Sequence, residues 1–212
     1  MKIFLIDPKK EWCKANLHCH TNRSDGFFTP EEIKKLYMEQ GYSIGAFSDH
    51  ELIFDNSNLT DDKFVAITAS EYSITLEGKP FNETYYDKNK PIKWNQIKTI
   101  HLNMFSKDPH NTFHFAMNKE KLTEYSKEKL RLYANGKFEC DGNGRTFTKE
   151  SIQNTIDLAN QNGFLVQLNH PNWSLNTRED YIDLKGLWSL EILNYLTELE
   201  TGTEDCVNIY DD

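Results

Sequence analysis

Residues 15–47 read ANLHCHTNRSDGFFTPEEIKKLYMEQGYSIGAF, and the order of elements within this stretch decides the expected fold class. A short strand over 15–18 precedes a polar loop. Residues 29–32 (TPEE) then combine an N-cap threonine, a first-turn proline and a capping-box glutamate. The helix that begins there is expected to end before Gly41, and a second apolar strand follows over 43–47. This order is typical of a parallel sheet with right-handed crossovers.

The rest of the chain continues this alternation of strands and helices. Apolar runs predict further strands at residues 64–67, 97–105, 164–168 and 187–193. A helix is expected over 148–160, with Gly163 after its end. The segment 106–147 is charged and then rich in Gly and Asn, which predicts an insertion or a long crossover. Because no linker divides the chain, we expect a single domain over residues 1–212.

The composition limits the classes of partner. The 212 residues carry 24 Lys and Arg against 33 Asp and Glu, a net charge of −9, which argues against a broad basic surface for long duplex nucleic acid. No apolar run approaches the ~18 residues of a membrane span, and residues 1–10 lack the features of a secretory signal. We therefore expect no membrane partner and a cytoplasmic protein. The four cysteines include no C-x-x-C pair and are expected to be reduced thiols.

Metal-capable side chains recur at or near the ends of the predicted strands. His18 and His20 flank the end of the first strand, where an H-x-H pair presents both imidazoles on one face and could hold one ion. Glu71 follows an apolar strand, and a carboxylate buried there needs a partner such as a pair of cations. In a parallel β/α barrel the carboxyl ends of the strands converge, so we expect these groups to meet. The candidate ligands are His18, His20, Asp25, His50, Glu71, His101 and His170.

Several of these residues also have a structural interpretation when each is taken alone. His18 and His20 could be partly exposed histidines. Asp25, in the loop SDG, could be a turn residue that hydrogen-bonds its own backbone. His50 could be a core histidine, and Asp49 either orients its ring or stabilises the end of the strand.

An arginine and a second pair of histidines are weaker candidates. Arg23, beside the SDG loop, could bind a substrate phosphate or be an ordinary surface arginine. His110 and His114 have the i, i+4 spacing of a zinc pair, but they lie in an irregular stretch with Pro109 and Asn111. We therefore predict that both are surface histidines rather than ligands.

Most of the candidate residues belong to an ordered set of short motifs. These are LHCHT (17–21), SDG (24–26), FSDH (47–50), SE (70–71), His101 and NHP (169–171). The set resembles the PHP (polymerase and histidinol phosphatase) domain family over nearly the whole chain. The resemblance implies an α/β fold, the distorted (β/α)7 barrel of the PHP type, with two or three divalent metal ions at its mouth. It also implies hydrolysis of phosphoesters.

The resemblance further implies how the ligands are shared. The implied sets are His18, His20 and Glu71 for one ion, Glu71, His101 and His170 for a second, and Asp25 with His50 for a third. The mixture of imidazole and carboxylate suits Zn, Mn or Fe. Two such ions would lower the pKa of a bridging water and hold phosphate oxygens.

One element of the family pattern is missing. The family ends with a further strand that carries an Asp-x-His pair, and no histidine follows His170 in this sequence. We therefore expect a barrel without its last strand, in a fragment of a longer protein rather than in a shortened family member. A missing strand leaves two sheet edges unpaired, which predicts low stability or self-association of the chain.

The preferred function is metal-dependent hydrolysis of a small phosphorylated substrate by a metal-bridging hydroxide. Hydrolysis of an amide or another non-phosphate bond is an alternative, since it would use the same metal chemistry. Because the Asp-x-His pair is missing, a non-catalytic module that is stabilised by metal is a further alternative.

Overall fold

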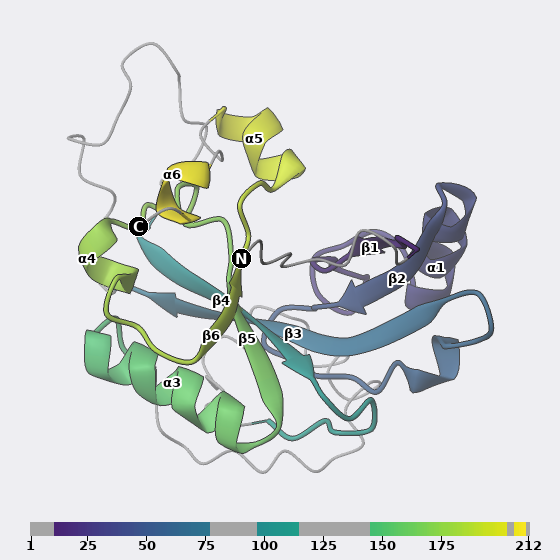
Figure 1. Ribbon diagram of the computed structural model, residues 1–212, viewed down its shortest axis with the longest axis horizontal. Coiled ribbons are helices and arrows are strands. Elements are labelled where there is room, and N and C mark those ends of the chain that lie inside the picture. The colour runs from purple at the N-terminus through teal and green to yellow at the C-terminus, as the bar shows by residue number, and fades with distance from the viewer. Residues whose placement is uncertain (1–10, 77–96, 115–144, 203–205, 211–212) are drawn as a thin grey trace, which may run out of the picture.

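The computed structural model describes residues 11–76, 97–114, 145–202 and 206–210, and every structural statement below concerns these residues. They form a six-stranded sheet that curls into half a barrel (Figure 1). The strands lie side by side in chain order: β1 (Lys14–Asn16), β2 (Tyr42–Phe47), β3 (Val65–Thr75), β4 (Thr99–Ser106), β5 (Phe164–Leu168) and β6 (Leu187–Leu190).

The sheet is mixed, so the prediction of a distorted (β/α)7 barrel is wrong. The pairs β1–β2, β2–β3 and β5–β6 are parallel, whereas β4 runs antiparallel to both of its neighbours. The protein belongs to the α/β class, with few helices around a half-barrel. Residues 15–47 do form a parallel strand–helix–strand unit. The strands after residue 47 were expected to be parallel, but an apolar run does not reveal the direction of its strand.

The longest helices begin and end where the capping residues predict. The Thr29 hydroxyl accepts a hydrogen bond from the Glu32 N–H at 3.2 Å, and the Glu32 carboxylate accepts one from the Thr29 N–H at 2.8 Å. Gly41 and Gly163 follow the two helices with φ of 79° and 85°, a left-handed conformation that glycine adopts without strain. The helices are α1 (Pro30–Glu39), the 3-10 helix η1 (Ser57–Leu59), α3 (Lys149–Gln161), α4 (Arg178–Tyr181), α5 (Tyr195–Thr201) and α6 (Val207–Tyr210).

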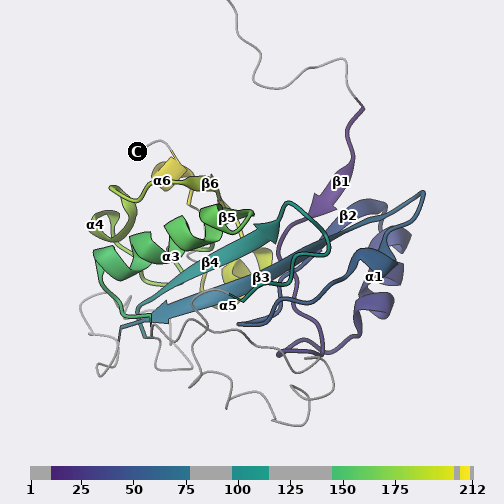
Figure 2. The same ribbon diagram turned by 90° about the horizontal axis from the view of Figure 1, so that it is seen from below.

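One face of the sheet is apolar and packs against α3 (Figure 2). Tyr72, Leu102 and Val166 belong to this core and are almost completely buried. Because side chains alternate along a strand, Glu71 and Asn103 lie on the opposite face. The fold therefore places polar residues of β3 and β4 on the face away from α3.

The remaining expectations concern segments around the sheet. Residues 115–144, which make up most of the predicted insertion at 106–147, lie outside the described residues, as does Cys140. Cys13, Cys19 and Cys206 are free thiols. None of the described helices has both the length and the apolar character needed to cross a membrane.

Candidate metal centre

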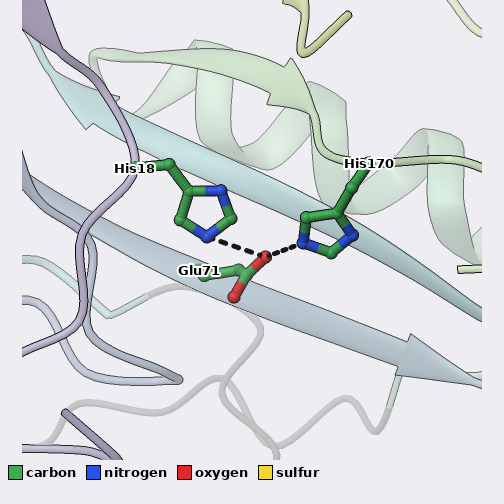
Figure 3. A group of neighbouring side chains, drawn as sticks. All are labelled: His18, Glu71 and His170. Atoms are coloured by element: carbon green, nitrogen blue, oxygen red, sulfur yellow. Dashed lines mark ion pairs between the residues drawn. The ribbon is translucent and has the colours of Figure 1, made fainter. Parts of the chain in front are cut away.

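The Glu71 carboxylate lies at the centre of a ring of imidazoles. Its side chain, in the middle of β3, is 1% exposed. Its Oε1 atom lies 3.2 Å from His170 Nε2, 3.4 Å from His18 Nε2 and 3.6 Å from His101 Nδ1. Figure 3 shows His18 and His170 pointing at this oxygen from two sides.

The second oxygen of the same carboxylate faces two further histidines. Glu71 Oε2 lies 3.2 Å from His50 Nδ1 and 3.3 Å from His20 Nε2. The other ring nitrogens of these histidines face Asp25, at 3.5 Å from His50 Nε2 and 3.6 Å from His20 Nδ1. Asp25 is 60% exposed and so forms the rim of this group.

The mixed sheet brings these residues together in a way that differs from the prediction. Glu71 lies within β3 rather than after it, and β3 is much longer than the predicted strand at 64–67. Because β4 is antiparallel to β3, its first residues lie beside the second half of β3, and His101 pairs with Ser73. His50 reaches Glu71 through an isolated parallel β-bridge. The site therefore combines the ends of parallel strands with the start of an antiparallel one.

Asp49 anchors the loop that carries Asp25. The Asp49 carboxylate is buried and accepts hydrogen bonds from the Thr21 N–H at 2.7 Å, the Thr21 hydroxyl at 2.8 Å and the Ser24 hydroxyl at 2.9 Å. These contacts connect the end of β2 to the loop after His20. Asp49 thus holds Thr21 and Ser24 against the end of β2. That Asp49 orients the ring of His50 stays a prediction.

Arg23, the candidate phosphate-binding residue, is half-buried against a neighbouring loop. Its Nη1 donates a hydrogen bond to Asn56 Oδ1 at 2.7 Å, and its guanidinium lies 4.6 Å from the centre of the Phe54 ring. These two contacts restrict the conformation of the Arg23 side chain, which therefore differs from a side chain that extends freely into solvent.

The prediction of two surface histidines is wrong for one of the pair. His110 is exposed, with its Nδ1 3.0 Å from an Asp55 oxygen. His114 is buried, and its Nε2 accepts a hydrogen bond from the Ile53 N–H at 3.0 Å. Burial lowers the pKa of His114 to about 4, although a hydrogen bond to Thr112 opposes the shift. The irregular segment after β4 packs on residues that follow β2, which local spacing could not indicate.

Sequence reasoning also missed two polar residues that contact the candidate ligands. Asn169 is completely buried, and its amide donates a hydrogen bond to Glu71 Oε1 at 2.8 Å. Glu191 follows β6 and lies 3.1 Å from His18 Nδ1. Asn169 comes directly after the predicted strand at 164–168, the signal that singled out Glu71, and that signal could have found it. Glu191 lies inside the predicted strand at 187–193, and only the structure ends β6 before it.

Opposite charges stabilise the ionised form of the central carboxylate. Burial opposes ionisation of Glu71, but the charges of His18 and His101 and the hydrogen bonds from the histidines hold its pKa well below the ordinary value. Burial likewise opposes protonation of His18, yet the Glu71 charge and the hydrogen bond to Glu191 raise its pKa to about 10. Without a metal ion, a proton on His18 therefore helps to balance the charge of the buried carboxylate.

The donors fit divalent cations such as zinc. Ligand atoms at 2.0–2.2 Å from a tetrahedral ion are about 3.3–3.6 Å apart, and the distances from Glu71 to its histidines are 3.2–3.6 Å. Two groups have ligand atoms close enough together to hold an ion: His18 with Glu71 and His170, and His20 with His50 and Glu71. His20 Nε2 also lies 3.1 Å from His18 Nε2, so the three residues of the first set implied by the family resemblance, His18, His20 and Glu71, lie together as well.

No protein-family model matches the chain. No curated protein matches its sequence. Among solved structures, the fold is similar to the crystal structure of a "putative metal-dependent phosphoesterase" from Bifidobacterium adolescentis. The TM-score is 0.51 at 15% sequence identity, over 85% of this chain and 77% of that chain. At this identity the likeness concerns the fold alone.

Proposed function

We propose that this chain is a metal-dependent hydrolase of small phosphoesters. The observation that carries the proposal is the sharing of one buried carboxylate, Glu71, between two groups of histidines. Such an arrangement suits a pair of divalent ions with a common ligand, as two-metal phosphoesterases require. The fold similarity to a protein described as a metal-dependent phosphoesterase supports the same reaction class.

Most residues of this site would bind metal, and Arg23 would bind the substrate. Glu71 would offer one oxygen to each of two ions, and the histidines would complete two sets of imidazole and carboxylate donors that suit Zn, Mn or Fe. Bound ions would polarise a phosphoryl oxygen and lower the pKa of water. No side-chain nucleophile is then needed.

Arg23 would bind the phosphate of the substrate. A guanidinium forms charge-assisted hydrogen bonds with phosphate oxygens, often through two nitrogens at once. Asn56 and Phe54 hold Arg23 beside the loop that carries Asp25. In this proposal, Arg23 selects for a phosphorylated substrate and the metal centre supplies the hydrolysis.

Metal content and hydrolysis test this function together. The chain is purified without chelator or histidine tag, its metals are measured by elemental analysis, and its rates are determined on phosphomonoesters, a phosphodiester and an amide. We expect two or more equivalents of Zn, Mn or Fe and preference for a phosphoester. Glu71→Gln preserves the shape but removes a charged ligand. It should lower the rate at least about 100-fold. Loss of a residue that only hydrogen-bonds a metal ligand costs up to about 100-fold, and loss of a ligand should cost at least as much.

Glu39→Gln, the same change at an exposed position of α1, serves as the control and should leave metal content and rate unchanged. Full activity of Glu71→Gln would contradict the metal centre. Turnover of the amide but of no phosphoester would contradict the substrate class and favour the non-phosphate alternative. A chain that binds metal but hydrolyses nothing would favour a non-catalytic module.

A further inference from the structure

The two outer strands of the half-barrel do not pair with each other, yet the residues that follow them meet. β1 and β6 stand at opposite ends of the strand order in the described sheet. His18 follows β1 and Glu191 follows β6, and His18 Nδ1 lies 3.1 and 3.2 Å from the two Glu191 oxygens. Both side chains are largely buried, at 9% and 13% exposure. This contact joins the two ends of the open sheet beside Glu71.

Glu191 also holds the backbone of a second candidate ligand. Its Oε2 accepts a hydrogen bond from the His170 N–H at 3.2 Å. The backbone of His170 has φ of 24°, a conformation that L-residues rarely adopt and that persists only where surrounding contacts fix it. The Asn194 amide lies 3.3 Å from Glu191 Oε1, and the Glu191 N–H donates to the Leu168 carbonyl at 2.9 Å. The carboxylate is thus itself held in place.

The ring of His18 faces two carboxylates through its two nitrogens. Nδ1 faces Glu191, and Nε2 faces Glu71 at 3.4 Å. A hydrogen bond from Nδ1–H to a carboxylate leaves the Nε2 lone pair for an ion and fixes the orientation of the ring. The contacts therefore define which nitrogen of His18 is available on the side of Glu71.

We infer that Glu191 is a positioning residue of the metal centre, which fixes His18 through Nδ1 and His170 through its main chain. The inference rests on the proposed metal-dependent function. Glu191 differs from a direct ligand because its two oxygens already face the outer nitrogen of His18 and the His170 N–H. Its effect on metal therefore passes through two histidines that follow β1 and β5.

The test measures Zn²⁺ affinity of the full chain by competition with a chromogenic chelator. Glu191→Ala should weaken binding about 10- to 100-fold. Glu191→Gln should stay within about 5-fold of wild type, because the amide oxygen accepts the same bond from Nδ1–H. The control Glu39→Gln should bind as wild type. Visible absorption of the Co²⁺-loaded protein should change shape in Glu191→Ala, since a displaced His18 alters the coordination.

The outcomes separate this inference from the proposed function. Wild-type protein that binds no zinc would contradict both. Wild-type affinity in Glu191→Ala would overturn the inference alone. Equal losses in Glu191→Ala and Glu191→Gln would also overturn it, because they would make Glu191 a direct ligand. If Glu191→Ala does not fold, the ¹⁵N chemical shifts of the histidine-labelled, zinc-loaded wild type provide the test. Zinc on Nε2 of His18 with a proton on Nδ1 would support the inference. Zinc on Nδ1 would overturn it.

Discussion

His18 is a residue at which a proton and a metal ion compete. Burial disfavours its charged form, but Glu71 and Glu191 outweigh burial and raise the pKa of its imidazole to about 10. Below that pH the metal-free protein holds His18 protonated. A metal ion needs the unprotonated Nε2, so binding must release this proton.

Metal affinity should therefore rise with pH. One released proton predicts an increase of about tenfold in Mn²⁺ affinity for each pH unit below the His18 pKa, and further protons make the dependence steeper. Competition titrations at pH 6.5, 7.5 and 8.5 would measure the slope. The number of protons released follows independently from calorimetry in buffers with different heats of ionisation. An affinity that does not change with pH would contradict a metal bound through His18.

Single residues of the site were predictable from the sequence to different degrees. His18, His20, His50 and the other candidate ligands were found because imidazole and carboxylate groups followed apolar strands in a recognisable order. Their grouping around the two oxygens of Glu71 depends on side-chain directions that the sequence does not contain. Glu191 escaped notice because it lies inside the predicted strand at 187–193, and its contact with His18 spans 173 residues. Asn169 directly follows a predicted strand, but its hydrogen bond to Glu71 spans 98 residues and is visible only in the structure.

Among the elements, those with local signals were predicted and those set by distant contacts were not. The capping box predicted α1, because Thr29 and Glu32 contact each other within one turn. The direction of β4 and the length of β3 depend on pairing between segments far apart in the chain, such as His101 with Ser73. Strand direction therefore needed the structure.

The segment after β4 contains a histidine that should make the fold sensitive to acid. Burial keeps His114 neutral in the folded protein by lowering its pKa to about 4. The unfolded chain protonates this residue near its ordinary value of about 6.5. The free energy of unfolding should therefore fall as the pH drops from about 6.5 to about 4, by up to about 3 kcal/mol from this residue.

Urea unfolding of the wild type and of His114→Gln at pH 7, 6 and 5 would isolate this contribution. The variant should lose less stability than the wild type over this range. His110→Gln is the matched control, since His110 is exposed on the same segment. Because this variant keeps His114, its free energy of unfolding should still fall between pH 6 and pH 5 as in the wild type. If the stability of His114→Gln and of wild type depended identically on pH, the pKa of His114 would not differ between the folded and unfolded states, and the prediction would be wrong.

At the scale of the whole molecule, the candidate site connects most of the sheet. Its residues lie on β3 and β4, follow β1 and β5, or follow β2. Together they carry several charges in a small volume on a sheet whose outer strands β1 and β6 do not pair with each other. An ion at Glu71 would join segments that backbone pairing alone leaves apart.

Metal removal should therefore lower the melting temperature of the protein. An ion that binds only the folded state contributes about 2.7 kcal/mol at 100 times its dissociation constant. For a chain of this size that corresponds to about 5–10 °C. Scanning calorimetry of chelator-treated protein with and without Mn²⁺ would measure the shift, and Glu71→Gln should show none. Equal melting of the treated wild type in both conditions would contradict metal binding at Glu71, because any ligand selective for the folded state must raise the transition.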